Sequence, residues 1–314
     1  MSAVKAIKKP AGKWGNVAKN VNKHWRLLLL IIPALTYIII FQYLPMYGII
    51  IAFKDFKPHT GYLGSEFVGL THFIRFFKSP NFSELISNTL LLSAFQLICS
   101  FPVPIILALS INLLTSKRYQ KVVQIVTYAP HFISTIVLVS IMRVILDPQS
   151  GIVNLALKSI GLDTLFFMGD AALFRPVYIL SDIWQNTGWS SIIYFAALSS
   201  VDPSMHEAAI IDGATKMQRV RYIDFPSILP MIITILILNT GKIMSVGFEK
   251  VFAMQNALNL SASEIITTYV YQVGIREGQY SYSAAINLFN SVINLILLLS
   301  VNAITKKTND VGII

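Results

Sequence analysis

Six stretches of this chain carry no charged residue, and they limit what it can fold into more than any other feature. A helix needs about 20 apolar residues to cross a hydrocarbon core about 30 Å thick. Four stretches exceed that length, one barely reaches it, and one is too short unless its helix continues past Lys242 toward Phe248. The pattern predicts an all-α membrane protein with six transmembrane helices. The stretches are Leu27–Phe53, Leu85–Ser116, Val122–Met142, Ile183–Val201, Phe225–Gly241 and Gly278–Thr305.

The stretches divide the chain into one membrane domain and two polar tails. Only 13% of the residues are charged, against about 25% in ordinary soluble proteins. Residues 25–305 are therefore expected to form the membrane domain. Residues 1–24 are predicted to be a basic tail without a cleavable signal peptide, and residues 306–314 a short C-terminal tail. The helices are predicted over 25–52, 85–115, 120–145, 174–200, 228–248 and 280–304.

The distribution of positive charge predicts the orientation of these helices. If the N-terminus is cytoplasmic, the formal net charge of +10 falls entirely on the inner segments, as the positive-inside rule requires. Both tails and residues 201–227 are therefore predicted to be cytoplasmic. A lipid membrane accounts for the basic composition, so no nucleic acid is expected as a partner.

Residues 201–227, which we call the inner elbow, are polar but keep apolar residues at helical spacing. Asp202 is suited to cap a helix, and Pro203 stands at the first helical position, where a missing N–H costs nothing. Gly213 can adopt a positive φ, which ends one helix and turns the chain into the next. The sequence therefore predicts a short helix, a glycine turn and a second, basic helix. Such an elbow between two membrane helices is suited to transmit force from a cytoplasmic partner.

The inner elbow resembles a motif of permease subunits of bacterial binding-protein-dependent ABC importers. The motif is E-A-A, three residues, G, nine residues, I, any residue, L and P. Here Glu207-Ala208-Ala209, Gly213, Ile223 and Pro226 match, while Phe225 replaces the usual leucine. In that family the elbow is a coupling helix that sits in a groove of the ATP-binding subunit. The resemblance implies that this subunit contacts Glu207, Ala208, Ala209, Asp212 and Gly213.

Further segments resemble the sugar permeases of this family, and more narrowly subunits that import complex oligosaccharides or polysaccharide fragments. They are Leu44–Gly48, Phe67–Leu70, Gly151–Asn154 and Gly278–Tyr282. The resemblance implies the type I, maltose-permease-like fold in a bacterial cytoplasmic membrane, and transport by alternating access. It also implies four partners: a second homologous permease subunit forming a heterodimer, two cytoplasmic ATP-binding subunits, and an extracytoplasmic solute-binding lipoprotein.

The sequence contains no motif for nucleotide binding or hydrolysis. A phosphate-binding loop needs G-x-x-x-x-G-K-[ST], and neither Gly12-Lys13 nor Gly241-Lys242 has the upstream glycine or the following hydroxyl residue. No zinc-protease or serine-hydrolase motif is present either. The chain is therefore expected to be no enzyme and to hold no cofactor or metal of its own. ATP and Mg²⁺ would be bound by the partner ATPase.

A polar stripe on the last predicted helix is a candidate for the substrate pathway. Asn287, Asn290 and Asn294 follow at helical spacing, and polar groups inside membrane helices are functional candidates because hydrocarbon offers them no partner. They could hydrogen-bond sugar hydroxyls. The same stripe could instead hold helices together or pack against a second permease chain.

The fourth predicted helix carries a cluster of aromatic and amide residues, Trp184-Gln185-Asn186 and Trp189. Sugars bind to proteins through aromatic faces and amide hydrogen bonds, so this cluster is a second candidate for the pathway. Its position near the outer end of the helix is equally typical of an interfacial aromatic belt.

Two further residues could face the pathway. Lys242 would attract an acidic oligosaccharide, or would extend to the outer interface. If the fifth helix continues, Glu249 lies on the same face as Lys242. Tyr128, in the third predicted helix beside Pro130 and His131, could contact substrate or pack within the protein.

Two other functions remain open at this point. An amino-acid or peptide permease of the same superfamily would share the inner elbow. An ion-coupled secondary carrier would need paired carboxylates inside the membrane, and the predicted helices hold only Asp182 and Glu249, both near helix ends.

Overall fold

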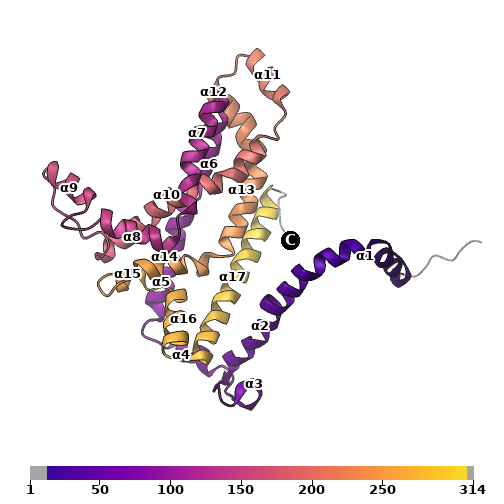
Figure 1. Cartoon of the computed structure of the whole chain (residues 1–314), viewed down its shortest axis with the longest axis vertical. Coiled ribbons are helices and arrows are strands. Elements are labelled where there is room, and N and C mark those ends of the chain that lie inside the picture. The colour runs from indigo at the N-terminus through magenta and orange to yellow at the C-terminus, as the bar shows by residue number, and fades with distance from the viewer. Residues whose placement is uncertain (1–12, 310–314) are drawn as a thin grey trace, which may run out of the picture.

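The computed structural model describes residues 13–309, which form an elongated and almost wholly helical molecule (Figure 1). Among these residues the only strands are β1 (Lys54–Asp55) and β2 (Glu66–Phe67), which pair antiparallel. Residues 1–12 of the predicted basic tail and residues 310–314 of the C-terminal tail lie outside the described range. The described fold agrees with the all-α prediction.

The first apolar stretch forms a long helix that leaves the body of the molecule (Figure 1). Its apolar part, Leu28–Phe53, is long enough to span a membrane, and none of its most apolar stretch is buried by the rest of the chain. The helix begins earlier than predicted, and only its last segment packs against the C-terminal helix. Its segments are α1 (Lys13–Ile38), the π-helical turn η1 (Ile39–Tyr43), α2 (Leu44–Met46) and the 3₁₀ helix η2 (Tyr47–Phe53).

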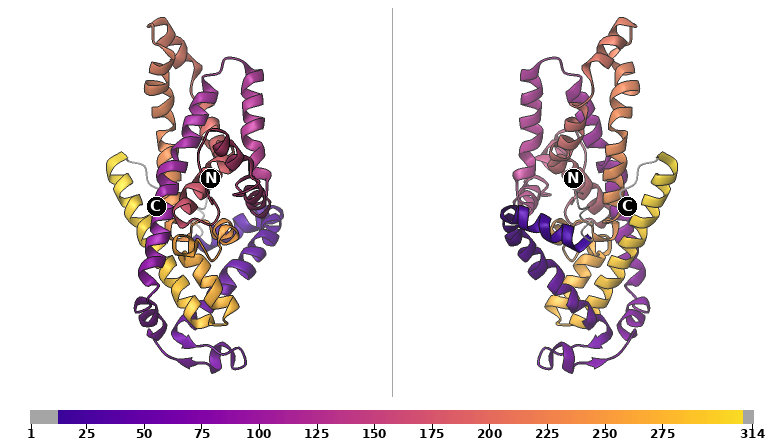
Figure 2. Two further views of the ribbon diagram at one scale, coloured as in Figure 1. Left: turned by 90° about the vertical axis from the view of Figure 1, so that its left-hand side faces the viewer. Right: turned by 90° about the vertical axis from the view of Figure 1, so that its right-hand side faces the viewer.

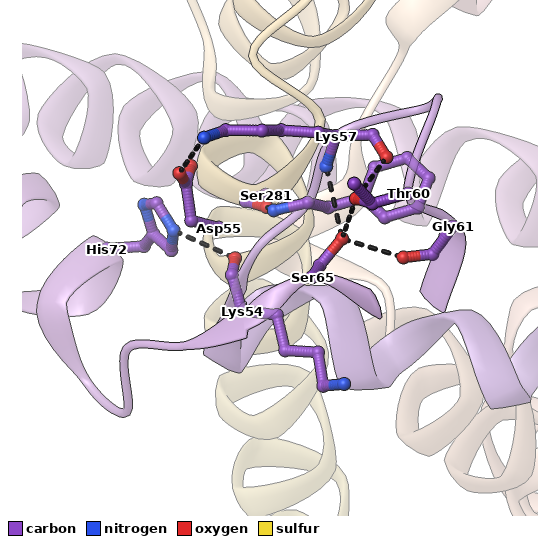
Figure 3. Close-up of polar contacts among 9 residues, drawn as sticks. Lys54, Asp55, Lys57, Thr60, Gly61, Ser65, His72 and Ser281 are labelled. Atoms are coloured by element: carbon purple, nitrogen blue, oxygen red, sulfur yellow. Dashed lines mark hydrogen bonds and ion pairs between the residues drawn. The ribbon is translucent and has the colours of Figure 1, made fainter. Parts of the chain in front are cut away.

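The chain then makes a compact turn that is fixed to the last long helix (Figure 3). Ser65 Oγ accepts a hydrogen bond from the backbone N–H of Lys57 at 3.2 Å, which closes the turn. The backbone N–H of Phe56 donates to Ser281 Oγ at 2.9 Å. This bond ties the turn to the start of the C-terminal helix. The segments here are α3 (Gly61–Gly64) and α4 (Thr71–Phe77).

The second apolar stretch is one continuous helix and the third is not. Phe82–Asn112 forms a single span of α5 (Phe82–Phe95), the π-helical turn η3 (Gln96–Ser100) and α6 (Pro102–Asn112). The predicted helix 120–145 is wrong, because two helical pieces meet there at a bend of 98°. Pro130 and the extended Ile133 end the first piece, and Ser134 caps the second by accepting from the N–H of Val137. The pieces are α7 (Lys117–Tyr128) with η4 (Ala129–Phe132), and α8 (Thr135–Ile145).

The fourth stretch lies at the centre of the fold. α10 (Ala171–Leu198) has 28 residues and packs against α6, α7, α13 and α15. Gly188 lets α10 approach α7 closely, because a Cβ at this position would overlap the backbone carbonyl of Thr127. Before α10 lies the short amphipathic helix α9 (Ile152–Ser159).

The fifth helix ends earlier than predicted. After α11 (Pro203–Ile211), a helix runs from Lys216 to Thr240, and the chain breaks there rather than continuing to 248. At the break Gly247 adopts a φ of +57°, close to Tyr178 of α10. Glu249 therefore lies on a separate helix, and the prediction that it shares a helix face with Lys242 is wrong. The segments are α12 (Lys216–Arg219), the π-helical turn η5 (Val220–Asp224), α13 (Phe225–Thr240), η6 (Ile243–Ser245) and α14 (Phe248–Met254).

The remaining chain forms short helices and one long terminal helix. Two buried clusters hold these elements to the body: one joins α14 and α15 to α8 and α10, and the other joins α16 and α17 to α4 and α5. Phe76 and Ile266 lie at the centre of the second cluster and are almost fully buried. The elements are α15 (Leu260–Ser263), α16 (Ile266–Tyr271), the π-helical turn η7 (Gln272–Arg276) and α17 (Tyr280–Asn309).

Four helices in the described range are long and apolar enough to cross a membrane. The bent pair α7–η4 and α8 would make a fifth. α10 has the length of a span but is not among them, and it carries charged and amide side chains.

The close fit at the break after α13 generates a prediction. Replacing Gly247 with alanine would strain a positive φ and push a methyl group into Tyr178. We expect the overlap to lower the free energy of unfolding by about 1–3 kcal/mol, in addition to the cost of placing alanine at a positive φ. The loss should appear as a lower thermal unfolding midpoint in detergent. Gly161→Ala is the matched control, because Gly161 has a φ of +80° and nothing within 4 Å of an added Cβ. Equal shifts in the two variants would contradict the packing at Gly247.

Candidate functional site

The inner elbow begins with a capped helix, as predicted. The carboxylate of Asp202 accepts a hydrogen bond from the backbone N–H of Ser204 at 2.9 Å, and Pro203 takes the first helical position of α11. This hydrogen bond holds the pKa of Asp202 below its ordinary value. The cap therefore stays ionised, and the start of α11 is fixed, at neutral and mildly acidic pH.

Gly213 turns the chain from α11 into the second helix. Its φ is +79°, and the N–H of Ala214 donates to the carbonyl of Ala209 at 2.8 Å. The N–H of Gly213 donates to Ile210 at 3.0 Å, so the end of α11 is a Schellman motif. Thr215 then starts α12 with a capping box closed by Gln218. The elbow is thus fixed at both sides of the glycine.

Most side chains of α11 are exposed, although His206 and Ala209 are half-buried. No residue of this helix is buried, and the exposed fractions of Ile210 and Ile211 are 55% and 86%. Glu207, Ala208, Asp212 and Gly213 are exposed, and Ala209 is half-buried. α11 lies at one end of the long axis, opposite the β1–β2 turn (Figures 1 and 2). An apolar helix presented in this way is suited to enter a groove of another protein.

A polar contact connects α11 to the membrane helix that follows it. His206 Nε2 lies 3.3 Å from Asp224 Oδ1, and Asn112 of α6 donates to the same oxygen at 3.2 Å. Asp224 is almost fully buried. This contact was not predicted, because the spacing of His206 and Asp224 along the chain gives no sign that they meet. A displacement of α11 would be passed directly to η5 and α6.

A cavity of about 500 Å³, lined by both polar and apolar side chains, lies between the α5–η3–α6 helix, α10 and the end of α13. We call it the membrane cavity. Its volume is within the range of small-molecule sites, about 300–1,000 Å³. Of the predicted pathway residues, Asn186 and Lys242 line it. Gln96, Asp182 and Asn239 also line it. These three were not predicted, because a single polar residue in an apolar stretch does not reveal which face it occupies.

Two asparagines of the predicted stripe brace the break after α13. Asn294 accepts from the N–H of Met244 at 2.9 Å and donates to Ser245 Oγ at 2.9 Å. The buried Asn290 donates to the same hydroxyl at 3.3 Å. Asn287 is exposed on another part of α17. In the structure, Asn290 and Asn294 thus connect α17 to η6.

The aromatic and amide cluster of α10 is divided between several neighbours. Gln185 is buried and donates to the carbonyl of Ile133 at 2.9 Å, whereas Trp184 is exposed. Trp189 stacks on the ring of His131 with centroids 4.6 Å apart. Tyr128 is half-buried near the end of α7. Of this group, Asn186 is the residue at the membrane cavity.

The described residues contain no cluster of three or more His, Cys, Asp or Glu that could hold a metal ion. Cys99 is exposed on η3.

Comparison with known proteins agrees with this arrangement. The model of the family described as binding-protein-dependent transport system inner membrane component matches residues 100–310. The polygalacturonan/rhamnogalacturonan transport system permease protein YteP of Bacillus subtilis is 44% identical over 91% of this chain and 89% of its own. Protein LplB of the same organism is also 44% identical, over 91% of this chain and 90% of its own.

A solved structure is similar over almost the whole chain. It is a bacterial alginate ABC transporter in complex with an alginate pentasaccharide-bound periplasmic protein, and the matching chain is 36% identical with a TM-score of 0.86. The match covers 94% of this chain and 99% of the other. These findings confirm the resemblance to sugar permeases and the type I permease fold. They also place the protein in the inner membrane as a multi-pass component.

The cap of α11 gives a second prediction. Replacing Asp202 with alanine removes its hydrogen bond to Ser204, which we expect to cost about 1 kcal/mol of local helix stability. The amide hydrogens of α11 should then exchange about fivefold faster by mass spectrometry. Asp212→Ala is the control, because Asp212 is also an exposed acid at an end of α11, but its carboxylate makes no hydrogen bond with the described residues. Equal exchange in the two variants would refute the capping role.

Proposed function

We propose that this chain, which belongs to the family of binding-protein-dependent transport system inner membrane components, conducts oligosaccharides across the membrane as the permease subunit of an ABC importer. The observation that carries the proposal is the exposed, doubly capped α11 at one end of the molecule. The sugar permeases among its relatives support an oligosaccharide, derived from a polysaccharide, as the solute.

The membrane topology that we propose has six spans and cytoplasmic termini. The six spans are the four long apolar helices, the bent pair of α7–η4 and α8, and α10. α10 comes fourth in chain order. Its 28 residues extend over about 42 Å at 1.5 Å per residue, which exceeds the hydrocarbon thickness. Its polar side chains suit a helix that lines a cavity rather than lipid. The same topology makes residues 25–305 the permease domain and leaves tails at 1–24 and 306–314.

The inner elbow is the proposed docking site for a cytoplasmic ATP-binding subunit. Glu207, Ala208, Ala209, Asp212 and Gly213 would form the contact. ATP and Mg²⁺ would be bound by that subunit, because this sequence has no phosphate-binding loop. The apolar, exposed face of α11 supports a groove as the partner surface.

A complete importer would contain a second permease subunit, two ATP-binding subunits and an extracytoplasmic solute-binding lipoprotein. The uncovered first helix supports the second permease subunit, because its apolar side chains are left without partners from this chain. The related alginate transporter is in complex with a periplasmic protein in its solved structure, which supports a solute-binding partner here. The β1–β2 turn lies at the end of the molecule opposite α11, where such a protein would dock (Figure 2).

Transport would proceed by alternating access. Closure of the ATP-binding subunits on ATP would move the groove that holds α11. The contact between His206 and Asp224, at 3.3 Å, would pass this movement to η5 and α13. α13 borders the membrane cavity, so its displacement would change which side of the membrane the cavity opens to.

The docking assignment predicts an uncoupled variant. Glu207→Lys reverses an exposed charge on α11 without removing a packing contact, and like charges at an interface cost several kcal/mol. We expect binding-protein-stimulated ATPase activity of the reconstituted importer to fall at least about tenfold, with normal membrane insertion. Asp163→Lys makes the same change on an exposed residue outside the elbow and should leave stimulation unchanged. Full stimulation in Glu207→Lys would contradict docking at α11.

The substrate class is tested by uptake into proteoliposomes that contain the complete importer. We expect uptake of oligosaccharides that depends both on ATP, supplied on the side of the ATP-binding subunits, and on the solute-binding protein. Two results would contradict this proposal. Uptake of peptides alone would favour the amino-acid and peptide branch, and uptake driven by an ion gradient without ATP would favour a secondary carrier.

A further inference from the structure

The membrane cavity contains two charged side chains that are in very different surroundings. They are Asp182, in the middle of α10, and Lys242, just after the end of α13. The rest of the lining consists of neutral polar and apolar residues. The charge that a solute meets in the cavity therefore depends on which of the two is already neutralised by the protein.

Asp182 is neutralised by the protein. Its carboxylate accepts hydrogen bonds from Asn186 at 2.8 Å and Gln96 at 3.2 Å. Lys250 Nζ lies 4.0 Å from Asp182 Oδ1 and 5.1 Å from the centre of the Tyr178 ring. Asp182 and Lys250 are both more than nine-tenths buried. A buried carboxylate persists in this way only with a paired charge and hydrogen bonds, so the pair adds no net charge to the cavity.

Lys242 has no such partner. Its side chain is exposed and lines the cavity. None of the ion pairs among the described residues includes it. The end of α13 favours a cation through the helix dipole, but this effect is small and does not neutralise the charge. Glu249, which the sequence placed on the same helix face, belongs to the separate α14. The cavity as a whole therefore carries one positive charge.

The neutral part of the lining also suits a polyol. The side-chain oxygens of Ser100 and Thr187 are buried and have no hydrogen-bond partner among the described residues. Both residues line the cavity, as does Asn239 near the end of α13, shortly before Lys242. Hydroxyl and amide groups of this kind can pair with sugar hydroxyls.

We propose that the membrane cavity selects oligosaccharides that carry a carboxylate, and that the ammonium group of Lys242 is the group that binds it. The proposal rests on the proposed function and names the chemical class of its solute. A carboxylate that leaves water for a cavity without a counter-charge loses its hydration at a large energetic cost. Lys242 replaces that hydration with a charge-assisted hydrogen bond. A neutral sugar would instead leave the ammonium group without an anion.

The test is uptake into proteoliposomes that contain the complete importer, with trigalacturonate as the acidic probe and α-1,4-linked galactotriose as the neutral one. We expect Lys242→Gln to reduce trigalacturonate uptake at least about tenfold, since charged hydrogen bonds commonly contribute that much. Lys242→Arg keeps the charge and should stay within about threefold of the original chain. Lys158→Gln, which removes an ammonium group from the distant α9, should have no effect.

The outcomes separate this inference from the proposed function. Unchanged trigalacturonate uptake in Lys242→Gln would overturn the inference. An equal loss in Lys242→Gln and Lys242→Arg, or an equal loss of both probes in Lys242→Gln, would also overturn it by showing a structural role. Import of galactotriose alone by the original chain would overturn the inference and leave the proposed function intact. Import of neither saccharide, together with ATP-dependent uptake of peptides, would overturn the proposed function itself.

Discussion

The absence of water from the hydrocarbon core is the constraint on which the rest of this structure depends. Inside a bilayer, a backbone or side-chain polar group must find a partner in the protein or face an aqueous cavity. The break after α13 shows how this chain meets the requirement. Asn294 and Asn290 of α17 bond to Met244 and Ser245 at the break, and the carbonyl of Ile243 accepts a hydrogen bond from Ser93 of α5. The irregular backbone is thus held by neighbouring helices and borders the membrane cavity.

The same constraint connects the two ends of the molecule. α11 extends beyond the body of the molecule (Figure 1), and the side chains of Ile210 and Ile211 are exposed on it. Its one firm connection to the body, among the described residues, is the contact of His206 with the buried Asp224. From there the helix of α12, η5 and α13 runs without interruption to the break at the membrane cavity. One continuous helix therefore joins the surface where force would enter to the place where the solute would pass.

Much of this could be predicted from the sequence, because caps and apolar runs are local features. Asp202, Gly213 and the apolar runs fix the elbow and most helix positions through interactions with near neighbours in the chain. The bend at Pro130 and the end of α13 at Thr240 were not predicted, although Pro130 and Ser134 are local signals for the bend. Tertiary partners also supply hydrogen bonds at both places, from Gln185 to Ile133 at the bend and from Met244 to Asn294 after α13. The pairing of Asp182 with Lys250 was missed because the two residues meet only in the folded chain.

The central claim is that α11 docks on an ATP-binding subunit. It is tested most directly by placing a photoreactive amino acid at Ala208, an exposed position on α11, in the assembled importer. We expect illumination to crosslink this position to an ATP-binding subunit, with a yield that changes when ATP is added. The same group at Lys158 of α9 should give no such product. The account would be contradicted if the group at Ala208 reacted only with lipid or water in an importer that transports solute.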